Sequence, residues 1–249
     1  MKKPKTKSQT IERAFLILDE LMDSDKDIAT LAARCDLTYS TAYRIINFLY
    51  QQGFLQKSDG KKFKLGSKLI QLGFRAYEST NLVKSARPYL EKLNEITQDT
   101  VHLAVNEAHE VVYMDKISGK RSVNISSRIG GRKKLHNTGV GKSLLLLKTP
   151  GDLAEIYKQE QGTPQEQQAF LDAMAAYRQK GYTLDIGEDS PNIRCVAAPI
   201  FSKSDCIVAA ISVSSAAEYV SDERILELID TVQKTSWAIS NEVYGYQKP

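Results

Sequence analysis

A cluster of polar side chains at the start of one predicted helix has the composition of a DNA-reading surface. Thr38 or Ser40 can cap this helix, which the apolar spacing extends to about Gln52. Recognition helices enter the major groove with residues of their N-terminal half, where hydroxyl groups suit phosphate or base edges and an arginine can bind guanine through two hydrogen bonds. The residues predicted to do this are Tyr39, Ser40, Thr41, Tyr43 and Arg44. The residues predicted to pack toward the core are Ala42, Ile45, Ile46, Phe48 and Leu49.

A basic hairpin is predicted directly after this helix. Asp59 and Gly60 form a two-residue turn signal between the alternating residues of 54–65. The lysines beside the turn, which we expect near the DNA backbone, are Lys57, Lys61, Lys62 and Lys64. Residues 1–9 add a lysine-rich arm that can reach the minor groove or more phosphate. The first 77 residues hold 14 Lys and Arg against 8 Asp and Glu, so the positive charge is concentrated where a polyanion would bind.

Taken singly, each of these features is typical of an ordinary solvated surface, but their order along the chain is more specific. Helices predicted near residues 11–22, 28–35 and up to residue 52 precede the hairpin, which is the order of a winged helix-turn-helix. We therefore predict a basic flexible arm over residues 1–9, a winged helix-turn-helix DNA-binding domain over residues 10–66 and a linker helix over residues 67–80.

From residue 81 onward the pattern changes to mixed strands and helices. Strands are predicted near residues 101–106, 111–117, 122–128, 182–186, 194–201 and 207–214. Helices are predicted near residues 85–98, from residue 139, and over residues 164–180 and 222–244. Because helices flank the strands at both ends, we predict an α+β domain over residues 81–249. It would have an antiparallel sheet with helices on its faces, an architecture common in ligand sensing.

The composition excludes several classes of protein. The cysteines, Cys35, Cys195 and Cys206, form no CxxC pair and no cluster with histidine at metal-binding spacing. We therefore expect no metal, no cofactor and a location in the reducing cytoplasm. No run of about 18 apolar residues is present, so no membrane span is expected. We also find no nucleophile with a base and no paired carboxylates at catalytic spacing, which argues against an enzyme.

The segment 139–143 (GVGKS) has the appearance of a phosphate-binding loop but lacks its pattern. Such a loop needs glycine five positions before Gly141, where this sequence has His136. A helix start explains the segment better, and the backbone N–H groups of Gly139 and Val140 would then suit a carboxylate. The alternative, which the residues support equally, is a close contact between helix and sheet that requires small side chains.

Four segments near the start of the sequence, residues 28–32, 37–44, 53–55 and 63–66, read IATLA, LTYSTAYR, GFL and FKLG. Five later segments, residues 127–130, 139–142, 181–182, 194–199 and 210–214, read SRIG, GVGK, GY, RCVAAP and AISVS. In these segments and in their order, the sequence resembles the IclR-type transcriptional regulators. The resemblance implies a GAF-like effector domain, a homodimer or homotetramer, a palindromic operator, and repression altered by a small carboxylic acid.

The same resemblance implies which residues line the effector pocket: Gly139, Val140, Asp185, Cys195, Ser212 and Ser214. Their chemistry fits a hydroxylated or oxo acid, with amides holding the carboxylate, Asp185 accepting from a ligand hydroxyl and the serines bonding ligand oxygens. Cys195 would be a small wall. The sequence departs from the family pattern at Gly187, commonly acidic, and at Asn192, usually glycine, where we expect asparagine to tolerate a positive φ.

Three further side chains are weaker candidates for ligand contacts. His102 lies on an early predicted strand and His136 beside the predicted pocket helix, but a lone histidine is more often a structural residue. Arg128 is a candidate carboxylate partner and equally a loop or interface cation. The sequence thus predicts a DNA-binding repressor of a carboxylic-acid catabolic operon. A sugar acid or 2-oxo sugar acid is the first expected effector and an aromatic acid the second. The alternatives are an enzyme acting on a small organic acid and an architectural DNA binder without a sensor.

Overall fold

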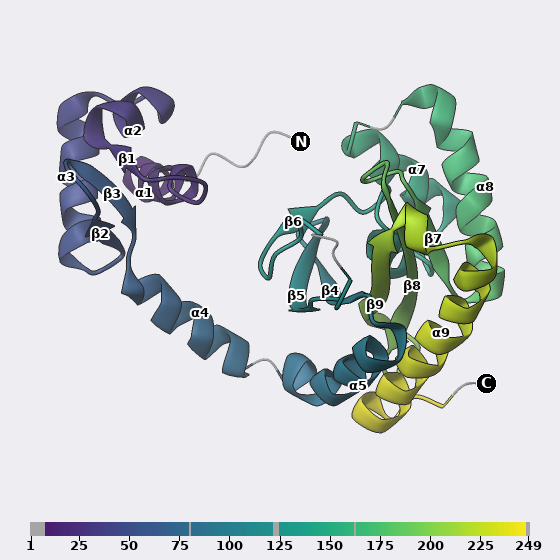
Figure 1. The fold of residues 1–249 in the computed structure, drawn as a ribbon. Coiled ribbons are helices and arrows are strands. Elements are labelled where there is room, and N and C mark those ends of the chain that lie inside the picture. The colour runs from purple at the N-terminus through teal and green to yellow at the C-terminus, as the bar shows by residue number, and fades with distance from the viewer. Residues whose placement is uncertain (1–7, 80, 122–124, 162, 248–249) are drawn as a thin grey trace. The chain divides into compact units, whose positions relative to one another are not determined.

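The computed structural model describes residues 8–79, 81–121, 125–161 and 163–247. These residues form two compact units that divide at residue 80 (Figure 1). Most of the predicted basic arm lies outside the described residues, and helix α1 begins at Gln9, within the range predicted for the arm. Each unit has its own core.

The first unit is a winged helix-turn-helix. Its helices are α1 (Gln9–Glu20), α2 (Ile28–Arg34), α3 (Tyr39–Gln51) and α4 (Ser67–Ser79). Its strands β1 (Lys26–Asp27), β2 (Leu55–Lys57) and β3 (Lys62–Leu65) form an antiparallel sheet in the order β1-β3-β2. The fold predicted for this part of the chain is confirmed.

Local chemistry fixes the ends of the two central helices of this unit. The Asp27 carboxylate accepts a hydrogen bond from the Thr30 N–H at 2.8 Å and so caps α2. The Thr38 hydroxyl accepts from the Thr41 N–H at 3.3 Å and caps α3, which settles the choice between Thr38 and Ser40. Gly53, with a φ of 77°, lies just after α3, where the left-handed region favours glycine. The ends of both helices are therefore set by residues close to them in the sequence.

The second unit is built on a six-stranded antiparallel sheet in the order β6-β5-β4-β9-β8-β7. The strands are β4 (Thr100–Glu107), β5 (Glu110–Ile117), β6 (Arg132–Lys133), β7 (Thr183–Ile186), β8 (Ile193–Phe201) and β9 (Ile207–Ala216). Helices α5 (Asn81–Thr97) and α9 (Asp222–Tyr244) pack together and cover one face (Figure 1). The short α6 (Gly139–Leu144) lies against β8 and β9. Helices α7 (Pro150–Gln159) and α8 (Pro164–Lys180) and the 3-10 turn η1 (Ala217–Tyr219) complete the unit.

The structure differs from the sequence expectation in two loops of this unit. Residues 125–128 are not in a strand, and 122–124 lie outside the described residues, so the strand predicted over 122–128 is wrong where it can be seen. Helix α7 was not predicted. Its start signals are nevertheless present, because Thr149 and Asp152 form a capping box ahead of Pro150. Helix α7 could therefore have been predicted from these local signals.

Helix α6 approaches the sheet closely because glycine occupies its first position. A Cβ atom added to Gly139 would lie 2.8 Å from the Cys195 Sγ atom. The Thr183 hydroxyl donates to the Gly139 carbonyl at 2.7 Å and bonds the Ser143 hydroxyl at 2.7 Å, which anchors α6 from strand β7. The sequence left two roles open for Gly139, close packing against the sheet and ligand binding. The structure shows the close packing.

We expect the substitution Gly139→Ala to destabilise the second unit. The added methyl group must displace the Cys195 side chain, at a cost of about 1–3 kcal/mol in the free energy of unfolding, which urea denaturation measures. Gly151→Ala is the matched control, because a Cβ there meets nothing closer than the Thr149 hydroxyl at 3.9 Å. Equal effects of the two substitutions would contradict the close-approach account.

Candidate functional site

The outer face of α3 presents the polar residues that the sequence selected for DNA. Ala42, Ile45, Ile46 and Leu49 are buried and define the inner face. Phe48, which the sequence also predicted to pack toward the core, is 61% exposed, so that prediction was wrong. Tyr39 and Tyr43 are 59% and 49% exposed although they are aromatic. Ser40 and Arg44 are exposed as well. A helix that leaves two tyrosines and an arginine exposed to solvent within its first two turns presents a surface suited to contact a partner molecule.

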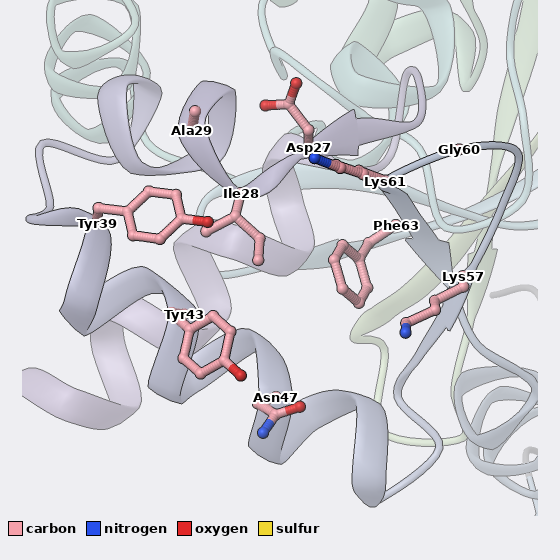
Figure 2. A pocket seen from close by; sticks show the side chains of 10 residues that line it. All are labelled: Asp27, Ile28, Ala29, Tyr39, Tyr43, Asn47, Lys57, Gly60, Lys61 and Phe63. Carbon is pink, nitrogen blue, oxygen red and sulfur yellow. The ribbon is translucent and has the colours of Figure 1, made fainter.

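A concave surface of about 380 Å³ lies between α3 and the hairpin. Figure 2 shows Tyr39, Tyr43 and Asn47 following one another along one side of α3. Lys57 and Lys61 of the hairpin line the same surface. Four residues predicted from sequence are therefore brought together here. Asn47 was missed, although its spacing of four from Tyr43 placed it on the same helical face, and an asparagine can bind adenine through two hydrogen bonds.

Thr41 and Arg44 line a different depression, of about 340 Å³, between α3 and α1. The Thr41 hydroxyl lies 2.9 Å from the Thr38 hydroxyl, so it takes part in the helix cap. Lys62 stands opposite Asp27 in the register of β1 and β3. The pKa of Asp27 is lowered chiefly by its hydrogen bond from Thr30 and also by the charge of Lys62. The predicted DNA-contacting residues thus divide between two faces, and Lys62 also has an acidic neighbour.

The second unit encloses a cavity of about 260 Å³ against its sheet. All six residues assigned to the effector pocket line it: Gly139, Val140, Asp185, Cys195, Ser212 and Ser214. Of the weaker candidates, His102 also lines it, whereas His136 bonds the Glu160 carboxylate at 2.7 Å and lines a separate depression. Arg128 is not among the residues that line the cavity.

Strand register explains why residues so distant in sequence share this cavity. Asp185 on β7 stands opposite Cys195 on β8, and Cys195 stands opposite Ser214 on β9. Ser212, two residues from Ser214 and therefore on the same face, stands opposite His102 on β4. A polar row thus crosses the middle of the sheet on the α6 side.

His102 is a neutral hydrogen-bonding group in this row. Its Nε2 atom lies 2.7 Å from the Ser127 hydroxyl and its Nδ1 atom 3.4 Å from the Ser212 hydroxyl. Burial lowers the pKa of His102 to about 3, with a smaller contribution from Lys116. The cavity therefore gains donors and acceptors from His102 but no positive charge.

Asp185 closes the turn that follows β7. Its Oδ1 atom accepts hydrogen bonds from the N–H groups of Gly187 at 3.1 Å and Glu188 at 2.8 Å. Burial raises the pKa of Asp185, and the neighbouring Glu188 carboxylate raises it further. Gly187, with a φ of 94°, meets the left-handed requirement of this turn. Asn192 is not among the residues with positive φ, so the expectation that asparagine must tolerate that conformation was wrong.

Cys195 forms an unreactive wall of the cavity. The side chain is buried, and burial raises the pKa of its thiol to about 12, with Asp185 adding to the shift. A thiol in this environment stays protonated at neutral pH and is not a nucleophile.

No group of three metal-ligating side chains occurs among the described residues. None of the described helices is long and apolar enough to cross a membrane.

A charged pair at the cavity was not predicted from the sequence. Lys133 and Asp189 both line it, and the Lys133 Nζ atom lies 3.0 and 3.1 Å from the two carboxylate oxygens of Asp189. Lys133 belongs to β6, a two-residue strand, and Asp189 to the turn closed by Asp185. The two residues are 56 positions apart in the sequence. No pattern in either segment predicts that their side chains meet.

Comparisons with known proteins identify the family of both units. Residues 10–59 match the IclR helix-turn-helix domain, and residues 74–241 match the C-terminal domain described as bacterial transcriptional regulator IclR. The chain belongs to the IclR family. It is a DNA-binding transcriptional regulator and not an enzyme, because both domains are those of regulators.

Named relatives and solved structures extend over nearly the whole chain. The HTH-type transcriptional regulator XynR of Escherichia coli K12 is 30% identical, over 96% of this chain and 98% of its own. The acetate operon repressor of Salmonella typhimurium is 28% identical, over 88% and 84%. An IclR homologue of Microbacterium hydrocarbonoxydans, solved with 4-hydroxybenzoate, has the same fold, with a TM-score of 0.81, 22% identity and coverage of 94% and 98%. The repressor class predicted from sequence is thus found among its relatives.

We expect the burial of His102 to give the protein a specific sensitivity to acid. The unfolded chain binds a proton at His102 below about pH 6.5, whereas the folded chain does so only near 3, so stability falls as pH drops through this window. In denaturant titrations, His102→Gln should remove up to about 1.4 kcal/mol per pH unit of that loss. The exposed His109→Asn, which suits the φ of 66° there, is the control and should keep the wild-type slope. Parallel pH profiles for wild type and His102→Gln would contradict the assignment.

Proposed function

We propose that this regulator represses a carboxylic-acid catabolic operon and that a small hydroxylated acid, bound in the cavity of the second unit, alters its affinity for the operator. The observation that carries the proposal is the meeting of Asp185, Cys195, Ser212 and Ser214 in one cavity, on a chain whose other unit exposes a recognition helix. Operator binding also argues for a location in the cytoplasm.

We infer the DNA contacts from the exposed positions of α3. Ser40 and Arg44 are exposed on its N-terminal half and are proposed to reach base edges, together with Asn47 one turn later. Tyr39, Tyr43 and Thr41 flank them and are proposed to fix the position of the helix on the backbone. The wing lysines are proposed to neutralise phosphate: Lys57, Lys61 and Lys62.

The chemistry of the cavity favours a ligand with several hydroxyl or oxo groups. Ser212, Ser214 and the neutral His102 offer donors and acceptors from the sheet. The amides of Gly139 and Val140 are proposed to hold one end of the carboxylate, on the opposite wall. A sugar acid or 2-oxo sugar acid uses all of these groups. An aromatic acid is the second candidate, since Tyr113 gives the cavity one aromatic side chain.

A homodimer, or a tetramer built from dimers, is proposed as the binding form. Ile11 and Phe15 on α1 are 58% and 61% exposed, and Ile70 and Phe74 on α4 are 73% and 61% exposed. Each pair has the spacing of four that places both side chains on one helical face. A second copy covering such faces would match the two-fold symmetry of a palindromic operator, which sedimentation of the protein–DNA complex checks.

We expect Arg44→Ala and Lys61→Ala to weaken DNA binding in different ways. Arg44→Ala should cost about 1–3 kcal/mol on the operator and relax preference at one base pair. Lys61→Ala should weaken binding to all sequences and reduce the slope of log affinity against log salt by about one. Gel shifts over a salt series measure both effects, with the exposed Lys203→Ala of the second unit as control. Identical behaviour of the Arg44 and Lys61 variants would contradict the assigned roles.

The function itself is tested by gel shifts with DNA from upstream of the regulated genes. D-gluconate, pyruvate and 4-hydroxybenzoate are added in turn, and at least one acid should change the operator affinity of the wild type. The double substitution Ser212→Ala and Ser214→Ala should abolish that response while operator binding without acid is kept. Operator binding that no acid changes, or a response that the double variant retains, would refute the sensing role. Failure to bind DNA specifically would refute the whole proposal.

A further inference from the structure

The ion pair between Lys133 and Asp189 spans the two outer strands of the sheet. Lys133 lies on β6 at one edge, and Asp189 lies in the turn after β7 at the other edge. Both side chains line the cavity, and both are only partly exposed, at 37% and 21%. The ammonium group contacts both carboxylate oxygens. The pair therefore connects opposite edges of the sheet across one wall of the cavity.

The charges of the cavity disfavour the binding of an acid while the ion pair between Lys133 and Asp189 stays intact. Lys133 is the sole cationic side chain among the described residues that line it, and Asp189 already pairs with it. Asp185 adds a second carboxyl group, and His102 adds no charge. An incoming carboxylate would therefore place additional negative charge in a partly buried site whose described lining has no unpaired cation to balance it, which is costly.

We propose that the carboxylate of the effector binds Lys133 in place of Asp189, so that acid binding breaks the ion pair that joins the two edges of the sheet. This inference rests on the function proposed above and identifies the cation that selects an acid. The exchange replaces one carboxylate by another and leaves the charge at Lys133 balanced. Asp189 lies near enough to solvent to recover hydration once it is released.

The turn that contains Asp189 determines what happens when its carboxylate is released from Lys133. Asp185 keeps the first part of this turn in place through the N–H groups of Gly187 and Glu188. Glu188 in turn pairs with the buried Lys142 of α6 at 2.6 Å. Acid binding therefore frees Asp189 in a turn whose preceding residue, Glu188, is bonded to α6. The ligand is thereby linked to that helix through two adjacent residues of the turn.

A permanent structural ion pair is the alternative, and the two accounts predict opposite signs for one variant. If the pair must stay intact for binding, Lys133→Gln and Asp189→Asn both break it and both weaken the binding of an acid. If the acid replaces Asp189, then Asp189→Asn removes a competitor and strengthens binding, whereas Lys133→Gln removes the partner and weakens it.

The experiment is calorimetric titration of the full chain with D-gluconate, pyruvate and 4-hydroxybenzoate, and with the uncharged D-gluconamide and 4-hydroxybenzamide. For an acid that binds the wild type, we expect Asp189→Asn to lower its Kd about tenfold and Lys133→Gln to raise it about tenfold or more. The neutral amides should bind with little change between the variants. Lys134→Gln, an exposed neighbour, is the matched control and should behave as the wild type.

Three outcomes would overturn the inference. Weaker acid binding by both variants would show a permanent pair, and unchanged acid binding by Lys133→Gln would show that this lysine does not select the acid. In both cases an acid still binds, so the proposed function stands. Binding of none of the acids to the wild type or to Asp189→Asn would overturn the inference together with the proposed effector class. Thermal unfolding of each variant without ligand verifies that the fold is kept.

Discussion

The close approach of α6 to strand β8 is the constraint on which the effector domain depends. Gly139 meets the Cys195 side chain with no room for a Cβ atom, and Thr183 holds the helix from β7. This contact places the start of α6 beside the polar row that strand register builds across the sheet. The cavity is the space left where the helix and the row meet, so its position follows from packing before any ligand is considered.

The DNA-binding unit is organised by a different constraint, the division of α3 into a buried and an exposed face. Four apolar side chains, Ala42, Ile45, Ile46 and Leu49, fix the helix in its core. Most of the remaining positions are exposed to solvent, and they carry tyrosine, serine, arginine and asparagine together with the apolar Phe48. Because burial fixes the rotation of the helix, the residues available for reading DNA follow from which apolar residues are buried. In both units, packing determines which side of a helix is available for binding: α3 in the first unit and α6 in the second.

Much of this could be predicted from the sequence. Capping residues, glycine ends and apolar spacing located α3, the hairpin and most of the sheet, because these signals are local. Asn192 shows where local reasoning failed, since the left-handed position of its loop belongs to Gly187. The Lys133–Asp189 pair could not be predicted, because it depends on how the edges of the sheet approach one another in space. Contacts between distant segments with no periodic pattern need the fold.

We propose that the cavity and the DNA-binding unit are energetically coupled. Coupling between two sites is reciprocal, so an acid that weakens operator binding must itself bind more weakly to the operator-bound protein, by the same factor. The direct measurement is the Kd of a bound acid for the free protein and for the protein saturated with operator DNA. The account predicts that the two Kd values differ by the factor by which the acid changes operator affinity. Equal Kd values would contradict it.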